Sequence, residues 1–544
     1  MLRKIVPGAL LLAASLPAQV PIYVPAENPL TPEKVVLGKI LFWDEQLSSD
    51  DSTACGTCHQ PAFGGSDPRA AQALHPGADG IFGTADDARG SFGVTRQAGN
   101  GRFTADATFG FRRQATHRTA PSHMGAAAAF DLFWDLRAGS QFLDPETGAE
   151  AIPFGGALES QAVVPILSPV EMGHEGRTWS QVRQKLQSAT PLALAHALTG
   201  DVQAALQQNP TYPLLFAAAF GTPAIDARRI AFALASYERT QLPDDTPWDR
   251  YTAGDTGAMT PTEKDGWIVF QGAGRCSACH WAPTFSDDLW HSLGLRPAGE
   301  DLGVGAFSDV SEDDGAFKTP TLRNAGLRPR LFHNGQSPAL DDPLQWTDPA
   351  STLNVYLQGH GVDTSNLDPF LLPLQQLGVS ANEVFLAQEF VRTALTDQRA
   401  ALQLPPFDHP TLRSTVAPPP RTFGQGRAGA TMPLVIDTVP AFPGNADWKL
   451  GLVAGGGTTI GVLGLGHASF EPGWSLLGLP LNVQIDAARL FFLPGGAGQP
   501  GHTTWNVPIP AALPPQSVFL QLFAFDAQAP FGLAASPGTE LPIW

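Results

Sequence analysis

Two short stretches decide how this chain folds: residues 55–59 read Cys-Gly-Thr-Cys-His, and residues 276–280 read Cys-Ser-Ala-Cys-His. Both match C-x-x-C-H, the attachment motif of c-type haem. Two thiols three positions apart can form thioethers with the two vinyl groups of one porphyrin, and the histidine that follows then lies beneath the iron as an axial ligand. The sequence therefore predicts two covalently bound haems, held by Cys55, Cys58, His59, Cys276, Cys279 and His280.

The motifs have two other interpretations. A C-x-x-C pair can be a redox dithiol or half of a zinc site. Zinc would need ligands from segments about 220 residues apart and would leave the two histidines unexplained. The chain has 4 cysteines, all of them in these motifs, so none remains for a disulfide.

A similar helical pattern precedes each motif, which indicates an internal repeat. Thr31 before Pro32, and Thr260 before Pro261, are typical of an N-cap followed by proline in the first helical turn. Glu263 adds a capping box to the second helix. The apolar residues expected on the buried sides of the two helices are Val35, Val36, Ile40 and Leu41, and Trp267, Ile268 and Phe270. Each unit is therefore a helix that leads into a haem loop, as in a cytochrome c.

Length, composition and charge restrict the class of protein. The chain has 544 residues, and 43% of them are hydrophobic, which is enough for real cores in more than one domain. Asp and Glu number 51 against 33 Lys and Arg, a net charge of -18. Because this balance repels phosphates, it disfavours nucleic acid and anionic membranes as partners.

Residues 1–18 are typical of an export signal. Arg3 and Lys4 precede a short apolar stretch, Ile5 to Leu16, which is too short to span a bilayer. The alternative is a buried N-terminal helix. Residues 451–468 carry no acidic or basic side chain, but their glycines and threonines favour strands and turns. We therefore expect an exported protein, periplasmic or secreted, with no membrane span.

The remaining patterns predict a mainly α fold, in which two cytochrome c-like haem domains are followed by a small β-sandwich-like C-terminal domain. Residues 226–239 have helical apolar spacing, and Ser380 with Glu383 forms a capping box for a last helix. Beyond residue 417 charges are rare, and apolar alternations such as residues 518–522 favour strands. The expected boundaries are 19–245 for the first haem domain, 246–415 for the second and 416–544 for the β-rich domain, whose role is either anchoring or passive.

These residues resemble the bacterial di-haem cytochrome c peroxidase family, which includes MauG-type relatives. The likeness covers roughly residues 30 to 400, and it is carried by residues 37–44, 133–137, 159–162, 169–173, 317–324 and 332–335. The resemblance implies two mostly helical haem domains with electronically coupled irons. It places the peroxide site at the N-terminal haem and electron entry at the C-terminal haem.

The resemblance also implies site residues beyond the motifs. Trp134 matches a tryptophan between the haems, and Glu171 matches the distal acid–base. Cleaving peroxide requires a proton to move from the near oxygen to the departing one, which a carboxylate can do. Gln161 matches a residue of the same pocket, and His75 matches a histidine that blocks the iron in the resting state. The ordinary alternatives are a core tryptophan, a solvated loop carboxylate and a surface histidine.

Three departures from the family pattern affect these expectations. Leu136 replaces a glycine, and insertions occupy about residues 75–115 and 140–157. The sixth ligand of the C-terminal haem is usually Met or Tyr, and no Met lies between Met259 and Met432. Tyr356 resembles the family's tyrosine, with His360 and His333 as rivals. A tyrosine ligand favours the MauG-type interpretation, because phenolate oxygen stabilises ferric iron.

The expected function is reduction of hydrogen peroxide to water, with electrons from a small c-type cytochrome or copper protein. The alternatives are a MauG-like oxidase of a protein or organic substrate, and a non-catalytic electron carrier. Residues 79–87 gather acids around turn glycines, so they are a candidate Ca²⁺ site, or simply an acidic turn. Assembly as a homodimer is left open.

Overall fold

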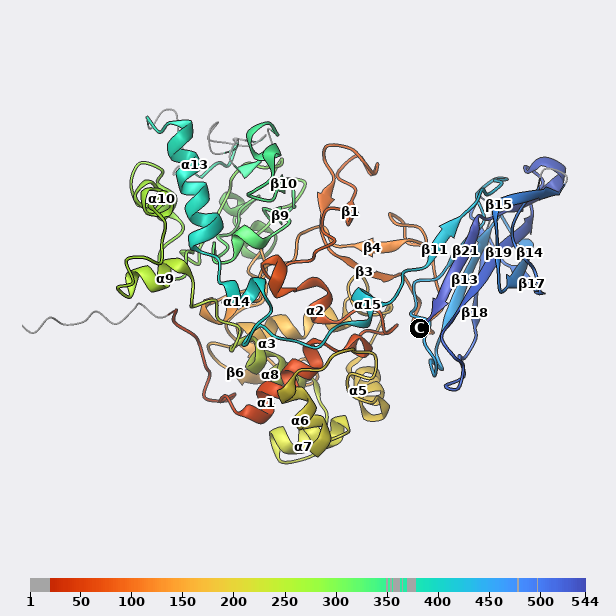
Figure 1. Cartoon of the computed structure of the whole chain (residues 1–544), viewed down its shortest axis with the longest axis horizontal. Helices are drawn as coiled ribbons and strands as arrows, with labels where there is room; N and C mark the ends of the chain where they lie inside the picture. Colours follow the sequence, from red (N-terminus) through yellow and green to blue (C-terminus); the bar gives the residue numbers. More distant parts are fainter. Residues whose placement is uncertain are drawn as a thin grey trace, which may run out of the picture.

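The structure is a computed structural model of the whole chain. It describes residues 20–348, 351–352, 355, 363, 365–368, 378–476, 479–496 and 498–544. The expected export signal, Tyr356 and His360 lie outside the described residues. Figure 1 shows a body of short helices and loops at the left, and a β-rich part that projects to the right. In the described part of the chain, no helix is long and apolar enough to cross a membrane.

Helices α1 (Pro32–Phe42) and α8 (Ala227–Glu238) form the centre of the first haem unit. The predicted N-cap is confirmed, since the Thr31 hydroxyl accepts a hydrogen bond from the Lys34 amide at 3.3 Å. The two helices cross closely at Gly38, where a Cβ would lie 1.9 Å from the Ala233 carbonyl oxygen. Around this pair lie α2 (Cys55–Cys58), α3 (Ala157–Ala162), α4 (Val164–Leu167), α5 (Trp179–Ser188), α6 (Gly200–Gln208) and α7 (Tyr212–Phe220).

The second unit repeats this crossing with α10 (Pro261–Gln271) and α13 (Ala381–Glu389). Both predicted capping boxes, at Thr260 and Ser380, are confirmed. A Cβ on Gly266 would lie 2.1 Å from the Leu386 carbonyl oxygen. The prediction for Ile268 is wrong: this side chain is 67% exposed, because α10 turns Phe270 and not Ile268 toward Phe390, the residue that follows α13. The other elements of the unit are α9 (Pro247–Thr252), η4 (Cys276–Ala278), α11 (Gly305–Ser308), β7 (Trp290–His291), β8 (Phe317–Lys318), β9 (Arg330–Leu331), β10 (Ser337–Pro338), η9 (Phe390–Ala394) and α14 (Gln398–Ala401).

Both insertions fold into short antiparallel pairs of strands. The first contains β1 (Leu74–His75) with β2 (Ala88–Arg89), and β3 (Phe92–Thr95) with β4 (Arg113–Ala115). The second contains β5 (Phe142–Leu143) with β6 (Glu150–Ile152). In Figure 1 the β3–β4 pair lies between the helical body and the β-rich part.

The β-rich part is built from several antiparallel sheets after α15 (Arg413–Val416). A six-stranded sheet has the order β11-β21-β19-β14-β17 with β20 beside β19, a second sheet has the order β12-β13-β18, and β15 pairs with β16. One apolar core, which includes Leu450, Leu452, Leu463 and Leu522, joins residues of the first two sheets. The strands are β11 (Arg421–Phe423), β12 (Leu434–Ile436), β13 (Lys449–Ala454), β14 (Thr459–Gly466), β15 (Ser469–Leu476), β16 (Leu479–Val483), β17 (Ala487–Leu493), β18 (Gly501–Asn506), β19 (Gln516–Phe525), β20 (Leu533–Ala535) and β21 (Gly538–Ile543).

The first insertion attaches the body to this β-rich part. Phe103 and Phe111, in the loop between β3 and β4, belong to the same apolar core as the strands. The Phe103 amide donates to the Thr504 hydroxyl at 3.0 Å. Lys449 Nζ donates to Gln97 Oε1 at 2.7 Å and to the Gly101 carbonyl at 2.8 Å. The insertion therefore supplies part of the core of the domain on which it rests.

We expect Phe103→Ala to lower the free energy of unfolding by about 3 kcal/mol or more, because it removes a fully buried ring from that core. Chemical denaturation of the holoprotein followed by circular dichroism measures the change. Ile81→Ala is the matched control, because Ile81 lies in the same insertion and is 60% exposed. A Phe103→Ala curve that overlays the wild-type curve would contradict the contact.

Candidate active site

The two motif histidines have the same hydrogen-bond geometry. His59 Nδ1 lies 3.2 Å from the Gly65 carbonyl oxygen, and His280 Nδ1 lies 2.9 Å from the Phe285 carbonyl oxygen. Burial lowers the pKa of both imidazoles, so both are neutral at neutral pH. A neutral imidazole that donates through Nδ1 presents the lone pair of Nε2 to a metal. The side chains therefore have the tautomer that an axial haem ligand needs.

None of the four motif cysteines forms a disulfide, and each is partly exposed. Burial raises the pKa of Cys58 and of Cys276 to about 12. Zinc ligands and redox-active cysteines depend on the thiolate, which such an environment disfavours. A thioether bond to a porphyrin leaves the sulfur neutral. The surroundings of the cysteines therefore fit a c-type haem better than a zinc site or a redox dithiol.

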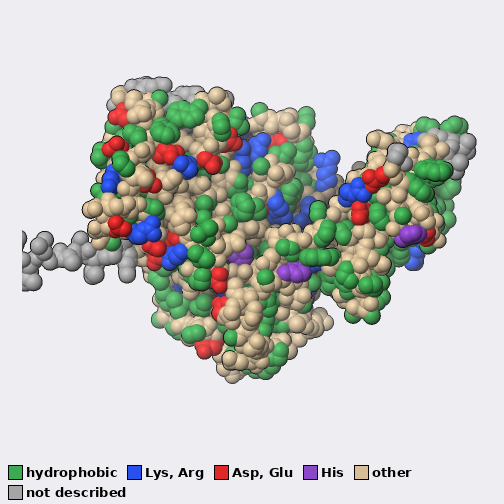
Figure 2. All heavy atoms as spheres, in the orientation of Figure 1, with side chains coloured by type: hydrophobic (Ala, Val, Ile, Leu, Met, Phe, Trp, Pro, Cys, Tyr) green, Lys and Arg blue, Asp and Glu red, His purple; other side chains and the backbone are tan. Residues whose placement is uncertain are grey.

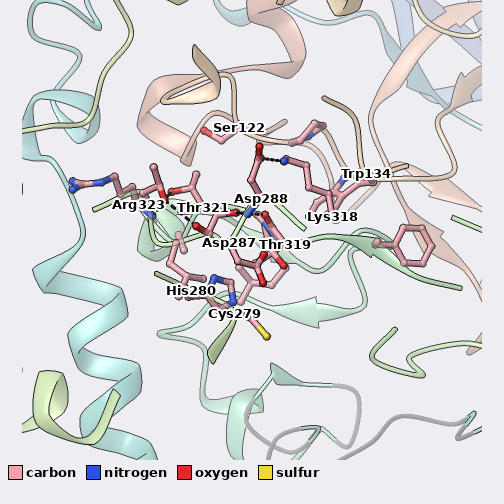
Figure 3. A pocket seen from close by; sticks show the side chains of 18 of the residues that line it. Ser122, Trp134, Cys279, His280, Asp287, Asp288, Lys318, Thr319, Thr321 and Arg323 are labelled. Atoms are coloured by element: carbon pink, nitrogen blue, oxygen red, sulfur yellow. Dashed lines mark hydrogen bonds and ion pairs between the residues drawn. The ribbon is translucent and has the colours of Figure 1, made fainter. Parts of the chain in front are cut away.

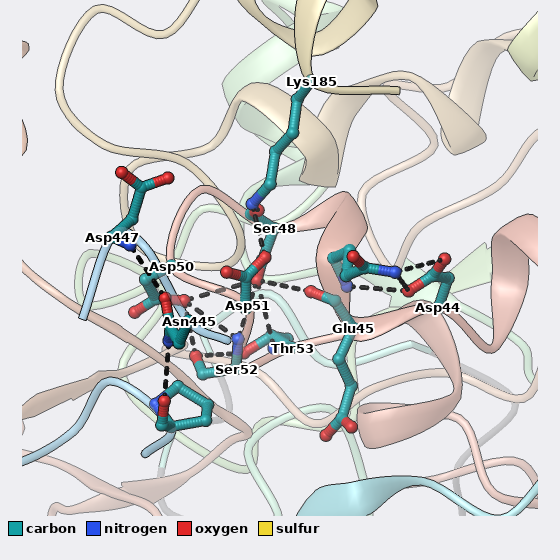
Figure 4. Close-up of polar contacts among 12 residues, drawn as sticks. Asp44, Glu45, Ser48, Asp50, Asp51, Ser52, Thr53, Lys185, Asn445 and Asp447 are labelled. Carbon is teal, nitrogen blue, oxygen red and sulfur yellow. Dashed lines mark hydrogen bonds and ion pairs between the residues drawn. The ribbon is translucent and has the colours of Figure 1, made fainter. Parts of the chain in front are cut away.

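A polar loop positions the first motif (Figure 4). The Ser48 hydroxyl accepts from the amides of Ser52 and Thr53 at 3.0 and 3.2 Å. Asp50 accepts from the Ser52 hydroxyl at 2.6 Å, and Lys185 on α5 forms an ion pair with Asp51 at 2.6 Å. These contacts fix the chain immediately before α2, which carries Cys55 and Cys58.

A cavity of about 570 Å³ extends from the first motif to the second. His59 and His280 both line it, as do Trp134, Gln161 and His333. Figure 3 shows Cys279 and His280 together on one side of this space, with Trp134 and Lys318 on another. Cys276 and Cys279 of the second motif also line it, whereas Cys55 and Cys58 do not. The two oriented imidazoles on a mainly apolar cavity fit the c-type haems that the motifs predict.

Trp134 lies where the two haem units meet. Its side chain is 7% exposed, and its Nε1 donates to the Thr119 carbonyl at 2.9 Å. The Trp134 carbonyl accepts from the Lys318 amide at 2.8 Å, and its ring centroid is 6.3 Å from that of His333. Leu136, at the position where the family pattern has glycine, has a left-handed backbone with φ 63°. Trp134 therefore contacts residues of both units, next to a turn that a non-glycine residue makes.

Glu171 follows α4 and lies against β3, and unlike Gln161 it is not among the residues that line the cavity. A Cβ on Gly93 would lie 1.8 Å from the Val170 carbonyl oxygen and 2.9 Å from the Glu171 Cα. Burial raises the pKa of the Glu171 carboxyl, and a hydrogen bond from Ser168 opposes this shift. The charge of Glu171 acts on both Cys55 and Cys58. Gln161, at the end of α3, lines the cavity.

His75 lies on β1, in the first insertion. Its Nδ1 is 2.9 Å from the Pro76 carbonyl oxygen, and its ring packs against His117 and Phe109 at centroid distances of 4.9 and 5.4 Å. Burial lowers the pKa of His75. Its role as a resting-state ligand stays a prediction.

Two further residues of the cavity wall were missed by the sequence analysis. His123 is 4% exposed, neither ring nitrogen has a hydrogen-bond partner, and its ring centroid is 5.8 Å from that of His59. Burial raises the pKa of Glu238 to about 8 and leaves Oε2 without a partner. The sequence held a signal for His123 but none for Glu238. Residues 121–123 read Pro-Ser-His and the matching residues 320–322 of the second unit read Pro-Thr-Leu, so His123 replaces a leucine in the repeat.

One group of metal-type ligands surrounds the second motif. Cys279, Asp287 and His291 bring ligand atoms within 4.8 Å of one another. The ring nitrogens of His291 lie 2.8 Å from Asp287 Oδ2 and 2.5 Å from Asp368 Oδ2. The hydrogen bond that His291 donates to Asp287 is the main cause that raises the pKa of His291 to about 11. Because Cys279 belongs to a haem motif, the histidine and its two carboxylates are better described as an ion-paired cluster beside the second haem.

The carboxylates of residues 79–87 are occupied within their own loop. Asp79 accepts from the Ile81 amide at 2.7 Å, and Asp87 accepts from the Gly83 amide at 2.7 Å. Calcium binding stays a prediction.

Comparison with known proteins gives the class of this chain. Residues 32–257 match the family model described as di-haem cytochrome c peroxidase. The methylamine utilization protein MauG of Methylorubrum extorquens is 33% identical over 323 residues, which cover 59% of this chain and 70% of that protein. The cytochrome-c peroxidase IdrP1 of Denitromonas iodatirespirans is 28% identical over 355 residues, which cover 59% of this chain and 74% of that protein.

A crystal structure of a MauG-like protein associated with microbial copper homeostasis has the same fold over 72% of this chain and 97% of its own. The TM-score is 0.50 at 20% identity. The chain therefore belongs to the di-haem cytochrome c peroxidase family, whose members include MauG, and it is an oxidoreductase of that family. The family carries two c-type haems, in agreement with the two motifs.

The raised pKa of Glu238 predicts a pH-dependent stability. The usual value is 4.5 and the folded value is about 8, so the folded chain keeps a proton that the unfolded chain loses between these values. The free energy of unfolding therefore falls as the pH rises through this window, on the order of 5 kcal/mol in total. Denaturation of the holoprotein at pH 5 and pH 8 measures the fall. Glu238→Gln should remove most of this pH dependence, whereas Glu27→Gln, at an exposed position, should leave it unchanged. An equal fall between pH 5 and pH 8 in the wild type and both variants would contradict the assignment of the pH dependence to Glu238.

Proposed function

We propose that this protein is a di-haem peroxidase that reduces hydrogen peroxide to water, using two electrons and two protons for each molecule of peroxide. The observation that carries this proposal is the half-buried Glu171 carboxyl, whose charge raises the pKa of both Cys55 and Cys58. The likeness to named cytochrome c peroxidases supports it. A carrier of electrons alone would have no use for an acid–base group held at the haem.

A haem held by Cys55, Cys58 and His59 would supply an iron that can bind peroxide and exchange electrons. The Glu171 carboxylate would accept a proton from one oxygen of the peroxide and return it to the other, departing oxygen. Its raised pKa brings the carboxyl closer to the working pH, where a general acid–base group is most effective. Gln161 on the cavity wall offers an amide that can hold peroxide by hydrogen bonds.

Electrons reach this site, in our proposal, from a small c-type cytochrome or copper protein that docks near the second haem. Trp134 lies in the wall of the shared cavity, and its contacts with Thr119 and Lys318 join the two units. His333 stacks on Phe317 at 3.4 Å, and burial lowers the pKa of His333 to about 3, so its ring is neutral. In this proposal the rings of Trp134, His333 and Phe317 carry electrons between the two haem units.

The domain arrangement of the proposal is the one expected from sequence. The first haem domain spans residues 19–245, the second 246–415 and the β-rich domain 416–544. The signal-like residues 1–18 support export to the periplasm or beyond. The β3–β4 contacts with the β-rich part favour a structural role for the appended domain.

The second candidate is a MauG-like oxidase that acts on a protein or organic substrate. The 33% identity with MauG favours it. A tyrosine ligand at the second haem would distinguish the two candidates, because Tyr356→Phe should then change the magnetic resonance signal of that haem.

Peroxide turnover with a reduced donor tests the proposed mechanism. We expect Glu171→Gln to lower kcat/KM for peroxide by about 100-fold or more, because the amide keeps the shape of the side chain and cannot transfer the proton. Glu175→Gln, an exposed carboxylate four positions along the chain, is the matched control and should keep wild-type activity. Undiminished activity in Glu171→Gln, with both haems attached, would refute the mechanism.

A further inference from the structure

Arg328 crosses from the second haem unit into the first. It follows the η6 turn (Ala325–Leu327), and its Nη2 donates to the Ala120 carbonyl at 2.9 Å. Nη1 lies 3.5 Å from the Gly64 carbonyl oxygen. A Cβ on Gly64 would lie only 2.6 Å from Arg328 Cγ, so the glycine leaves room for this side chain to lie over the loop that follows His59.

The guanidinium of Arg328 has no carboxylate partner among the described residues. It lines the cavity that His59 and His280 share. Burial lowers its pKa to about 10, and its positive charge also acts on His59. Three other cations of the same wall are ion-paired: Lys318 with Asp288, Arg323 with Asp249 and Arg296 with Glu300.

Arg328 is half-buried, and a guanidinium has more N–H groups than the two that its carbonyl contacts use. Unlike Arg330, it lines the shared cavity, from which an anion can reach its charge. A c-type haem is attached through its vinyl groups at one edge and carries two propionate carboxylates at another. A guanidinium suits a carboxylate particularly well, because its planar N–H groups can form two parallel hydrogen bonds with the two oxygens.

We propose that Arg328 is the binding site for a propionate carboxylate of the first haem, contributed by the second haem unit. The inference rests on both haems being attached, and not on the reaction that they catalyse. The contact would tie the second unit to the cofactor of the first, in the same wall as Trp134 and His333. A fixed positive charge at this place favours the reduced iron, which carries one positive charge less.

The test is a reductive titration of the mature holoprotein followed by absorbance, which gives the midpoint potential of each haem. We expect Arg328→Gln to lower the midpoint potential of the first haem and to leave that of the second haem unchanged. Arg328→Lys keeps the charge and should stay near the wild-type value.

Arg330→Gln is the matched control. Arg330 lies two positions away, and burial also lowers its pKa to about 10, but its guanidinium donates to the Gly335 and Gln336 carbonyls of its own loop. This variant should leave both potentials unchanged. Unchanged potentials in Arg328→Gln, or an equal shift in Arg330→Gln, would overturn the proposal.

If the Arg328→Gln protein does not fold, a second measurement on the Arg328→Lys protein tests the proposal. The resonance Raman bending band of the propionates reports their hydrogen bonds directly. It should differ between wild type and Arg328→Lys, because an ammonium cannot make the paired contacts of a guanidinium. An identical band in the two folded proteins would overturn the proposal. Haem content and peroxide turnover are measured separately, so a failure of the proposed enzyme activity would not be mistaken for a failure of this contact.

Discussion

The hydrogen bond from a histidine Nδ1 to a backbone carbonyl, made once in each unit, is the contact on which the haem chemistry depends. It fixes both the tautomer and the direction of the ring. In each unit the accepting residue has a left-handed backbone: Gly65 has φ 72° and Phe285 has φ 53°. Glycine adopts this conformation freely, whereas Phe285 is held in it by packing against Trp248, Phe270 and Phe390. The two units thus reach one geometry by different means.

The first insertion connects two features that lie far apart in the sequence. Its β3–β4 pair contacts the loop of Glu171, through the hydrogen bond from Val94 to Val170 and through the close approach of Gly93. The loop between the same strands places Phe103 and Phe111 in the core of the β-rich part. The position of the proposed acid–base loop is therefore coupled to the appended domain by a single stretch of chain.

Local signals in the sequence were sufficient for the helices and the motifs. The caps at Thr31, Thr260 and Ser380 were predictable, because each depends on side chains within four residues of the helix start. Ile268 was predicted wrongly, since apolar neighbours at successive helical positions cannot all face one partner. The burial of Phe103 among strands more than 300 residues away has no local signature. Among the described residues, the His123 ring has no hydrogen-bond partner and Arg328 has no carboxylate partner. Both facts depend on which segments meet, so only the three-dimensional arrangement shows them.

The sharing of Phe103 and Phe111 has a consequence for any transfer of the C-terminal region to another protein. Strands moved alone would have an interior that lacks two aromatic rings. An engineer who wishes to transplant this region onto another cytochrome would therefore have to transfer the loop between β3 and β4 as well.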